Sequence, residues 1–296
     1  MAGHSDARRV DEAEVRRIVA GALREDGAAN DVTTSYLGIG HREISAVLIA
    51  RARGVIAGVD VARLAFEEAD PEVRFETRVG DGARVRDGDV VARLEGRAAG
   101  ILAAERTALN FLQRLSGVAT VTAAFVERVR GTGVRILDTR KTTPLFRGLE
   151  KYAVRVGGGE NHRFSLSDMV LVKENHLRAV GGVPALRDIL ERKRPPADVE
   201  VEVDSIGFLR ELLGAPVRRV MLDNFSPGNV VEAVGAIAAY RRDNPGYSIA
   251  VEVSGGVDLE NVRDYAVPGV DYISIGALTH SAHALDLSLE VEGDAV

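Results

Sequence analysis

VEVEVDSIGFLRELLGAPVRRVMLDN, residues 199–224, is the stretch that decides the fold class of this chain. It begins with a mainly apolar run, continues through a segment whose leucines have helical spacing, and ends in a second apolar run. Runs rich in Val, Ile and Leu are typical of strands in a parallel sheet, which are buried on both faces. Parallel pairing needs a crossover, which is usually a helix. The stretch therefore predicts a β-α-β unit.

The same rhythm extends on both sides of this stretch, from residue 134 onward. Helical segments lie between most of the runs, and the whole covers about 150 residues, fewer than a standard eight-stranded barrel needs. We therefore expect an incomplete α/β barrel of about six strands, with an open doubly wound sheet as the competing arrangement. The six runs are VRILDT, DMVLVK, VEVEVD, RRVMLDN, SIAVEVS and YISIGA.

The first hundred residues mix helix and strand without this rhythm. Residues 11–26 and 59–68 have the spacing of amphipathic helices, whereas 44–58 and 73–94 read as short strands. Asp-Gly pairs divide the second strand region, as hairpin turns do. This part of the chain is therefore expected to form a region distinct from the barrel.

A long helical stretch at 103–130 separates these two regions. Ser116-Gly117 is a candidate break in it, because both residues weaken a helix. On the helical wheel Arg106 falls opposite the apolar side. A lone arginine in that place is ordinarily solvated, and the alternative is a side chain offered across an interface.

Composition narrows the class of protein. The chain has 296 residues, is 46% hydrophobic and 28% charged, and carries a net charge of −6, which disfavours a general nucleic-acid surface. Cysteine is absent, which excludes disulfides and thiolate chemistry. No apolar run reaches spanning length and the N-terminus lacks a signal sequence, so we expect a cytoplasmic protein without a membrane partner.

Charged residues, polar residues or glycines follow each predicted strand. In parallel α/β folds, active sites lie at the carboxyl ends of the strands. Strand ends in register converge on one mouth. Cations clustered there against an acidic background predict a pocket for a polyanion, because each desolvated phosphate or carboxylate needs a charged donor. The strand-end residues are Arg140-Lys141, Lys173, Glu202, Asp223-Asn224, Ser254-Gly255-Gly256 and Gly276.

Two kinds of ligand site are consistent with these residues. Glycines after the last two strands let backbone N–H groups approach an anion, so they predict a phosphate site; the alternative is that they only turn the chain. Glu202 and Asp223 on successive strands are suited to Mg²⁺, or they pair with neighbouring lysines. The pair His280 and His283 lacks a third ligand, which disfavours a transition-metal site.

Several dense motifs, in order along nearly the whole chain, resemble the quinolinate phosphoribosyltransferase family, also called nicotinate-nucleotide pyrophosphorylases. The chain departs from the family at Leu145-Phe146, where Pro-Gly-Leu or Pro-Gly-Phe is usual, and leucine is disfavoured at positive φ. The motifs are NDVTTSYL (30–37), AERTALNFLQRLSGVAT (104–120), DTRKTTP, LEKYAV and NHR within 138–176, EVEVD, MLDN, EVSGG and ISIGALTHS.

The resemblance implies an enzyme, nicotinate-nucleotide diphosphorylase (carboxylating), a pentosyltransferase of de novo NAD biosynthesis. Its reaction joins quinolinate to phosphoribosyl pyrophosphate (PRPP) with Mg²⁺ and yields nicotinate mononucleotide, pyrophosphate and CO₂. The implied fold is an N-terminal α+β sandwich (1–115), an incomplete barrel (116–280) and a C-terminal segment (281–296) packing on the N-terminal domain. The implied assembly is a homodimer in which Arg106 is contributed across the interface, and a larger assembly is left open.

The resemblance also assigns roles to residues. Lys141, Glu202 and Asp223 are the expected catalytic residues, and Glu202 with Asp223 the expected metal ligands. Quinolinate is expected to bind Arg106, Arg140, His162, Arg163 and Lys173. The PRPP phosphates are expected to bind Lys141, Lys173, Ser254, Gly255, Gly256, Gly276 and His280.

Three other functions remain open from the sequence. A molybdenum-associated paralogue shares much of the motif pattern and would use a different acceptor. Lysines on barrel strands, here Lys141 and Lys173, are also compatible with a Schiff-base aldolase. The third is a phosphate-binding protein without catalysis.

Overall fold

The computed structural model describes residues 11–193 and 195–292, and the chain divides into two compact units. Unit 1 takes in the described chain up to Ala123, Thr143–Gly158 and the described chain from Leu278 onward. Unit 2 takes in Ala124–Thr142 and Gly159–Ala277. The ends of the predicted N-terminal domain (1–10) and C-terminal segment (293–296) lie outside the described residues.

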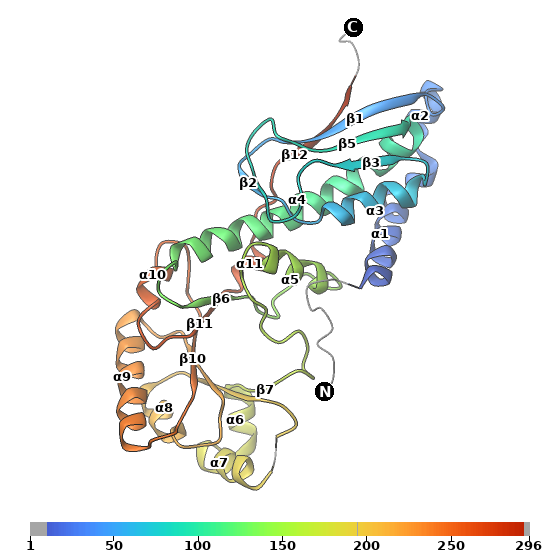
Figure 1. Cartoon of the computed structure of the whole chain (residues 1–296). Helices are drawn as coiled ribbons and strands as arrows, with labels where there is room; N and C mark the ends of the chain where they lie inside the picture. The colour runs from blue at the N-terminus through green and yellow to red at the C-terminus, as the bar shows by residue number, and fades with distance from the viewer. Residues whose placement is uncertain (1–10, 194, 293–296) are drawn as a thin grey trace. The chain divides into compact units, whose positions relative to one another are not determined.

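Unit 1 contains a four-stranded antiparallel sheet in the order β12-β1-β5-β3 (Figure 1). Leu48 of β1 and Leu94 of β5 are fully buried, as is Phe66 of helix α3. The last strand of the described chain, β12, pairs with β1 and so completes this unit. The elements are α1 (Glu12–Asp26), η1 (Ala28–Asn30), α2 (Val32–Leu37), β1 (Glu43–Ala50), β2 (Gly54–Val55), α3 (Val59–Ala69), β3 (Arg74–Thr77), β4 (Arg84–Val85), β5 (Val90–Arg97), α4 (Ala98–Arg128), α5 (Arg147–Val156), α11 (Ala277–His280) and β12 (Leu287–Glu292).

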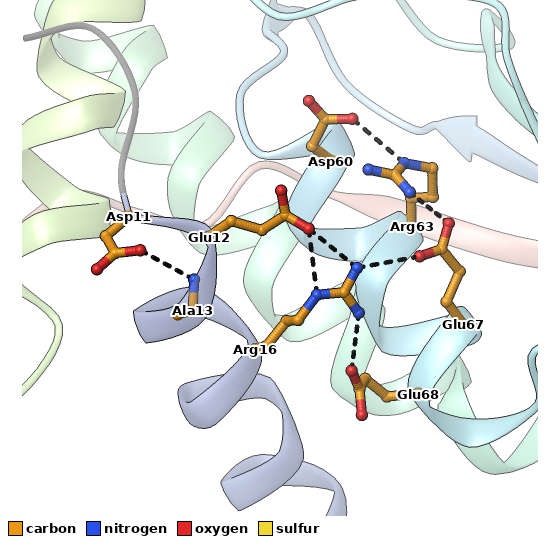
Figure 2. A network of polar contacts seen from close by, with 8 residues as sticks. All are labelled: Asp11, Glu12, Ala13, Arg16, Asp60, Arg63, Glu67 and Glu68. Carbon is orange, nitrogen blue, oxygen red and sulfur yellow. Dashed lines mark hydrogen bonds and ion pairs between the residues drawn. The ribbon is translucent and has the colours of Figure 1, made fainter. Parts of the chain in front are cut away.

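An exposed network of ion pairs joins α1 to α3 (Figure 2). Arg16 on α1 donates to Glu12 one turn earlier, at 3.0 Å, and to Glu68 on α3, at 2.9 Å. Arg63 on α3 pairs with Glu67 one turn later. Solvent screens these pairs, so the apolar residues buried between the two helices carry most of the packing free energy.

Helix α4 runs without interruption, so the predicted break at Ser116-Gly117 is wrong. Ser116 Oγ accepts a hydrogen bond from Ala57 N at 3.0 Å. A Cβ on Gly117 would lie 2.0 Å from the carbonyl oxygen of His283. Both residues are small because other segments of unit 1 pack closely against the helix, and this packing outweighs their weak helix propensity.

Helix α5 carries a carboxylate, Glu150, that is fully buried. It accepts hydrogen bonds from Arg114 Nη2 (2.6 Å) and Nε (3.2 Å), and from Thr143 N (3.0 Å) and Oγ1 (2.9 Å). Arg114 also donates to the carbonyl oxygens of Ala282, at 2.8 Å, and of Thr279. The ion pair between Arg114 and Glu150 therefore ties two further segments to α4 and α5: the residues just before α5, and the chain at the end of α11 and directly after it.

Leu145, next to this cluster in the chain, has φ +62° and is 81% exposed. A left-handed conformation costs a residue with a Cβ roughly 1–2 kcal/mol. The position where the family usually has glycine therefore does require a positive φ, and here leucine adopts it.

Unit 2 is built on six parallel strands, one for each predicted apolar run, in the order β6-β11-β10-β9-β8-β7. Neighbours are consecutive from β7 to β11, and the last strand then pairs with the first. This order is that of a barrel, since a doubly wound sheet would reverse direction in its middle. Strands β6 and β7 are the two edges, so the prediction of an incomplete six-stranded barrel is confirmed. The strands are β6 (Arg135–Leu137), β7 (Val170–Val172), β8 (Val199–Val203), β9 (Arg219–Asp223), β10 (Ala250–Ser254) and β11 (Tyr272–Ser274).

The helices of unit 2 lie around these strands (Figure 1). Serines begin two of them by capping: Ser205 Oγ accepts from Phe208 N at the start of α8, and Ser226 Oγ from Asn229 N at the start of α9. Among the described residues, no helix is long and apolar enough to cross a membrane. The helices are α6 (Glu174–Val180), α7 (Val183–Arg192), α8 (Ile206–Leu212), α9 (Pro227–Asp243) and α10 (Val262–Tyr265).

Candidate active site at the carboxyl ends of the parallel strands

The register of the parallel strands aligns the predicted site residues in rows. Glu202, Met221 and Glu252 are partners across β8, β9 and β10. Asp223 and Ser254 are partners in the next row toward the carboxyl ends. Side chains in a row and two residues apart point to the same side of a sheet, so these polar groups share one side.

Two lysines and two carboxylates meet at this end of the barrel. Lys173, which follows β7, forms an ion pair with Glu202 of β8. Burial raises the pKa of Asp223, the neighbouring Glu202 charge raises it further, and Lys173 and Lys141 oppose the rise. Predicted residues from four strand ends therefore act electrostatically on one another.

The donor set at Glu202 and Asp223 fits a magnesium ion. Both are carboxylates, they lie on adjacent strands, and their charges repel across the space between them. A divalent cation relieves such repulsion, and Mg²⁺ is typically held by one or two carboxylates with the remaining ligands from water and substrate phosphate.

Two arginines form a second cationic centre. Burial lowers the pKa of Arg163, and the neighbouring charge of Arg140 lowers it further. Arg163 Nη1 donates to the carbonyl oxygen of Met169 at 3.2 Å. Two guanidinium groups held near each other are suited to a ligand with two carboxylates, because such a ligand offsets the repulsion between them.

Asp138 holds the segment Asn161-His162-Arg163 by hydrogen bonds. It directly follows β6 and is fully buried. Asp138 Oδ1 accepts from His162 N at 2.9 Å, and Oδ2 accepts from Asn161 Nδ2 at 2.5 Å. Asp138 thus ties the segment that carries Arg163 to the strand that precedes Arg140.

The His162 side chain faces the protein interior and is 6% exposed. Its Nδ1 accepts a hydrogen bond from Arg163 N at 2.7 Å. Its Nε2 lies 3.1 Å from Glu200 Oε2 and 3.5 Å from Glu252 Oε1. Both ring nitrogens are therefore directed at protein groups.

Three ligand atoms of His162, Glu200 and Glu252 lie within 4.8 Å of one another, a spacing that would suit a metal ion. The hydrogen bond from Arg163 N argues against this. An Nδ1 that accepts carries no proton, so the neutral ring has its proton on Nε2, which then cannot ligate. The trio is consequently a cluster of buried ionisable groups in close contact.

A tight turn follows β10 at Ser254-Gly255-Gly256. Gly255 has φ +92°, and a Cβ there would lie 2.2 Å from Asn224 Oδ1, so only glycine fits. Asn224, itself at φ +57°, donates its backbone N–H to Ser254 O at 2.8 Å. The turn therefore brings backbone close to the loop after β9, and Gly276 follows β11 at the same end of the barrel.

Two predicted site residues belong to unit 1. Arg106 lies on α4 with an exposed side chain, as its helical position predicted. His280 ends α11 and is exposed, with its Nδ1 2.6 Å from Ser281 Oγ. The other predicted site residues lie in unit 2.

Four residues near the site were not among the predicted ones: Asp138, Glu200, Arg219 and Glu252. Arg219 Nη1 donates to Glu252 Oε2 at 2.8 Å. The available signal was an ionised residue inside an apolar run, as in VEVEV and AVEVS, which indicates a polar group facing the barrel interior.

Comparisons with known proteins agree with this geometry. The family profile "Quinolinate phosphoribosyl transferase, N-terminal domain" matches residues 31–116, and the corresponding C-terminal profile matches 118–290. The chain is 43% identical over 279 residues to a nicotinate-nucleotide pyrophosphorylase [carboxylating] of Mycobacterium leprae, covering 93% of this chain and 96% of the relative. A probable enzyme of the same name from Bacillus subtilis is 36% identical, with 94% and 93% covered.

Solved structures give the same answer. NadC from Streptococcus pyogenes superposes with a TM-score of 0.87 at 38% identity, covering 96% of this chain and 98% of that one. The nicotinate-nucleotide pyrophosphorylase from Francisella tularensis has a TM-score of 0.86 at 36% identity, with 98% and 100% covered. On both family profiles and on relatives matched over nearly their full length, this chain belongs to the quinolinate phosphoribosyltransferase family.

Proposed function

We propose that the protein transfers the phosphoribosyl group of PRPP to quinolinate, with loss of CO₂, to give nicotinate mononucleotide and pyrophosphate. The observation that carries this proposal is the pair Arg140 and Arg163 beside the cluster of Lys141, Lys173, Glu202 and Asp223. Quinolinate is a dianion and PRPP a polyanion, so they meet only where cations offset their repulsion.

The quinolinate subsite consists of Arg140, Arg163 and Lys173, with Arg106 of the partner subunit. Arginine binds carboxylates through two parallel hydrogen bonds, which fixes the orientation of the pyridine ring. His162 contributes to the same subsite. A ring held this way presents its nitrogen to the anomeric carbon of the ribose.

The PRPP subsite consists of Lys141, Lys173, Ser254, Gly255, Gly256, Gly276 and His280. The turn at Ser254-Gly255-Gly256 supports a phosphate role because two successive glycines at positive φ carry no side chains of their own that would keep an anion from the backbone N–H groups. Mg²⁺ held by Glu202 and Asp223 would supply positive charge to the pyrophosphate.

The reaction then follows from these contacts. The pyridine nitrogen bonds to the anomeric carbon of the ribose as the bond to pyrophosphate breaks, and Lys141 stabilises the charge that develops on the leaving group. The nitrogen becomes a pyridinium, whose positive charge stabilises the electron pair left on the adjacent ring carbon when the 2-carboxylate leaves as CO₂. A proton replaces CO₂ at that carbon.

An assay with quinolinate, PRPP and Mg²⁺ tests the function, with release of CO₂ and formation of the mononucleotide as readouts. Nicotinate in place of quinolinate is the control and should give little product. Absence of product with quinolinate would overturn the proposal and favour the molybdenum-associated paralogue. A Schiff-base aldolase has less support, because Lys173 is ion-paired with Glu202 and an ammonium is not nucleophilic.

The dimer is proposed with the function. Helix α2 exposes Val32 (77%), Tyr36 (88%) and Leu37 (58%), an apolar surface that a second copy would cover. Arg106 is exposed in the same unit.

Lys141→Ala and Arg106→Ala should each lower turnover about a hundredfold, the typical loss of one preorganised charge contact. Mixing the two inactive variants under subunit exchange should restore activity, because one of the two sites in each mixed dimer keeps both residues. No recovery despite confirmed exchange would show that Arg106 does not act across the interface.

A further inference from the structure

A buried cluster of ionisable groups lies in the barrel beneath the candidate site, and the mechanism above gives no role to three of its members, Glu200, Glu252 and Arg219. Glu200 and Glu252 are both fully buried, near the middle of β8 and β10. His162 Nε2 faces both carboxyl groups, at 3.1 and 3.5 Å. Arg219 donates to the far oxygen of Glu252, and its guanidinium stacks 4.2 Å from the centre of the Tyr272 ring.

Such a cluster is a costly way to fill a strand interior. Removing charges from water costs several kcal/mol per ion, and apolar residues of similar volume are often at least as stabilising. Polar clusters that persist in buried places frequently serve to fix one arrangement of the groups they bond.

The imidazole ring of His162 connects the buried carboxylates to the backbone of Arg163. Its Nε2 lies 3.1 Å from a Glu200 oxygen and 3.5 Å from a Glu252 oxygen, and these two close contacts hold the ring in place. With the ring fixed, Nδ1 stands where it accepts the backbone N–H of Arg163 at 2.7 Å. The cluster therefore determines the position of the Arg163 backbone.

Arg163 is the group in this chain of contacts that the proposed function assigns to quinolinate. Its charge acts directly on that of Arg140, and its guanidinium is steadied by Met169 O at 3.2 Å. A displacement of its backbone would change the distance between the two arginines. That distance decides how well two carboxylates on adjacent ring carbons are matched.

We propose that His162, Glu200, Glu252 and Arg219 are positioning residues that hold Arg163 in register for a dicarboxylate ligand, with His162 acting through the Arg163 backbone rather than by touching the substrate. This inference rests on the proposed function, since it concerns the subsite assigned to quinolinate. It adds a specificity device: a rigid arginine pair selects an aromatic diacid over a monoacid.

Two replacements of His162 separate its ring nitrogens. Asn places an acceptor near Nδ1 but has no donor that reaches the glutamates, whereas Gln places a donor near Nε2 but no acceptor for Arg163 N. The proposal requires both ends, so His162→Asn and His162→Gln should each raise the dissociation constant for quinolinate about tenfold, the effect of one hydrogen bond of about 1.4 kcal/mol. The KM for PRPP should stay within about twofold of wild type.

A double-mutant cycle then tests the route through Arg163. If His162 acts through Arg163, the effect of His162→Gln on quinolinate binding disappears when Arg163→Ala is already present. Additive effects would overturn the proposal, because they would mean that His162 acts on the ligand independently. Glu252→Gln keeps the shape of the side chain, and its smaller loss of quinolinate affinity should likewise vanish beside His162→Asn.

Asp70→Asn is the matched control for loss of stability alone. Asp70 is a buried carboxylate paired with an arginine, Arg97, at 3.0 Å, as Glu252 is with Arg219, but it lies in unit 1. This variant should be destabilised with unchanged quinolinate affinity. Calorimetric titration of wild-type protein with quinolinate comes first: no binding there defeats the proposed function, whereas wild-type binding with an additive cycle defeats only the positioning role.

Discussion

Buried carboxylates in the two units have the same exposure and different surroundings. Glu150 in unit 1 accepts four hydrogen bonds, two from Arg114 and two from Thr143. Glu200 and Glu252 in unit 2 are also fully buried, yet they face each other, and both contact Nε2 of His162. Burial raises the pKa of each to about 7, and for Glu252 the charge of Glu200 adds to the rise.

The difference teaches that burial by itself does not define what a charged residue does. A buried carboxylate that accepts hydrogen bonds on both of its oxygens is held in one position, and Glu150 in this way holds two segments of unit 1 together. A pair of carboxylates with fewer donors depends on where one histidine ring points. We expect the first cluster to govern stability and the second to govern ligand binding.

Replacing Glu150 should give the largest loss of stability among the changes considered. Glu150→Ala leaves the partly buried Arg114 without its carboxylate partner, and removing one member of a buried ion pair costs about 3–5 kcal/mol. Urea unfolding followed by circular dichroism measures the loss. Glu150→Gln is the control, since it keeps an acceptor for Thr143 and should lose less. Equal losses in both would mean that the charge of Glu150 contributes nothing.

The buried carboxylates of the barrel, Glu200 and Glu252, should make the free energy of unfolding depend on pH. The pKa of Glu252 is about 7 in the folded protein and near 4.5 when unfolded. Between these values the folded carboxyl keeps a proton that the unfolded one releases, so its contribution to stability falls as pH rises from 4.5 to about 7. Glu252→Gln should remove this part of the slope in urea unfolding measured across that interval. An unchanged slope would place the titration elsewhere.

A smaller effect concerns the turn that Glu150 holds through Thr143. Leu145→Gly relieves roughly 1–2 kcal/mol of backbone strain. The more flexible unfolded chain offsets about 0.5–1 kcal/mol of this, so the net gain should stay near 1 kcal/mol. Leu166→Gly is the control, because Leu166 is 70% exposed and lacks a positive φ. A rise in melting temperature for both variants would contradict the role of strain.

The smallest effect is expected on the surface. Arg16→Ala removes the centre of the ion-pair network between α1 and α3 (Figure 2). Exposed pairs are screened by solvent and salt, so the urea midpoint should hardly move. A loss as large as that of Glu150→Ala would show that exposed and buried pairs do not differ in this protein.

The fold could be predicted from sequence because its signals are local. Each of the six parallel strands is an apolar run, and the polar residues after the runs mark the edge where the site lies. The break expected at Ser116-Gly117 failed because small residues weaken a helix and also permit close packing, and local sequence does not distinguish the two.

The residues of the candidate site that follow the strands could be predicted from the sequence, whereas the buried residues that contact them could not. Strand ends can be counted, so Lys173, Glu202 and Asp223 follow from the pattern of runs. The direction of the His162 ring depends on Glu200 and Glu252, which reach it from strands distant in the chain. No local pattern carries that information, because alternation along a strand gives the side that a residue faces and not its partner.

Strands β6 and β7 are the two ends of the six-stranded sheet, and this opening separates two groups of cations. Arg140 and Lys141 follow one end, and Lys173 follows the other. Elsewhere the ladder of main-chain bonds fixes the spacing of neighbouring strand ends, whereas on its open side β6 bonds the loop residue Glu160, whose N donates to Ile136 O at 2.8 Å, and not β7. An anion that contacts both groups of cations at once would link the strand ends of β6 and β7, which no main-chain ladder joins. Ligand binding would then complete the barrel at its open side.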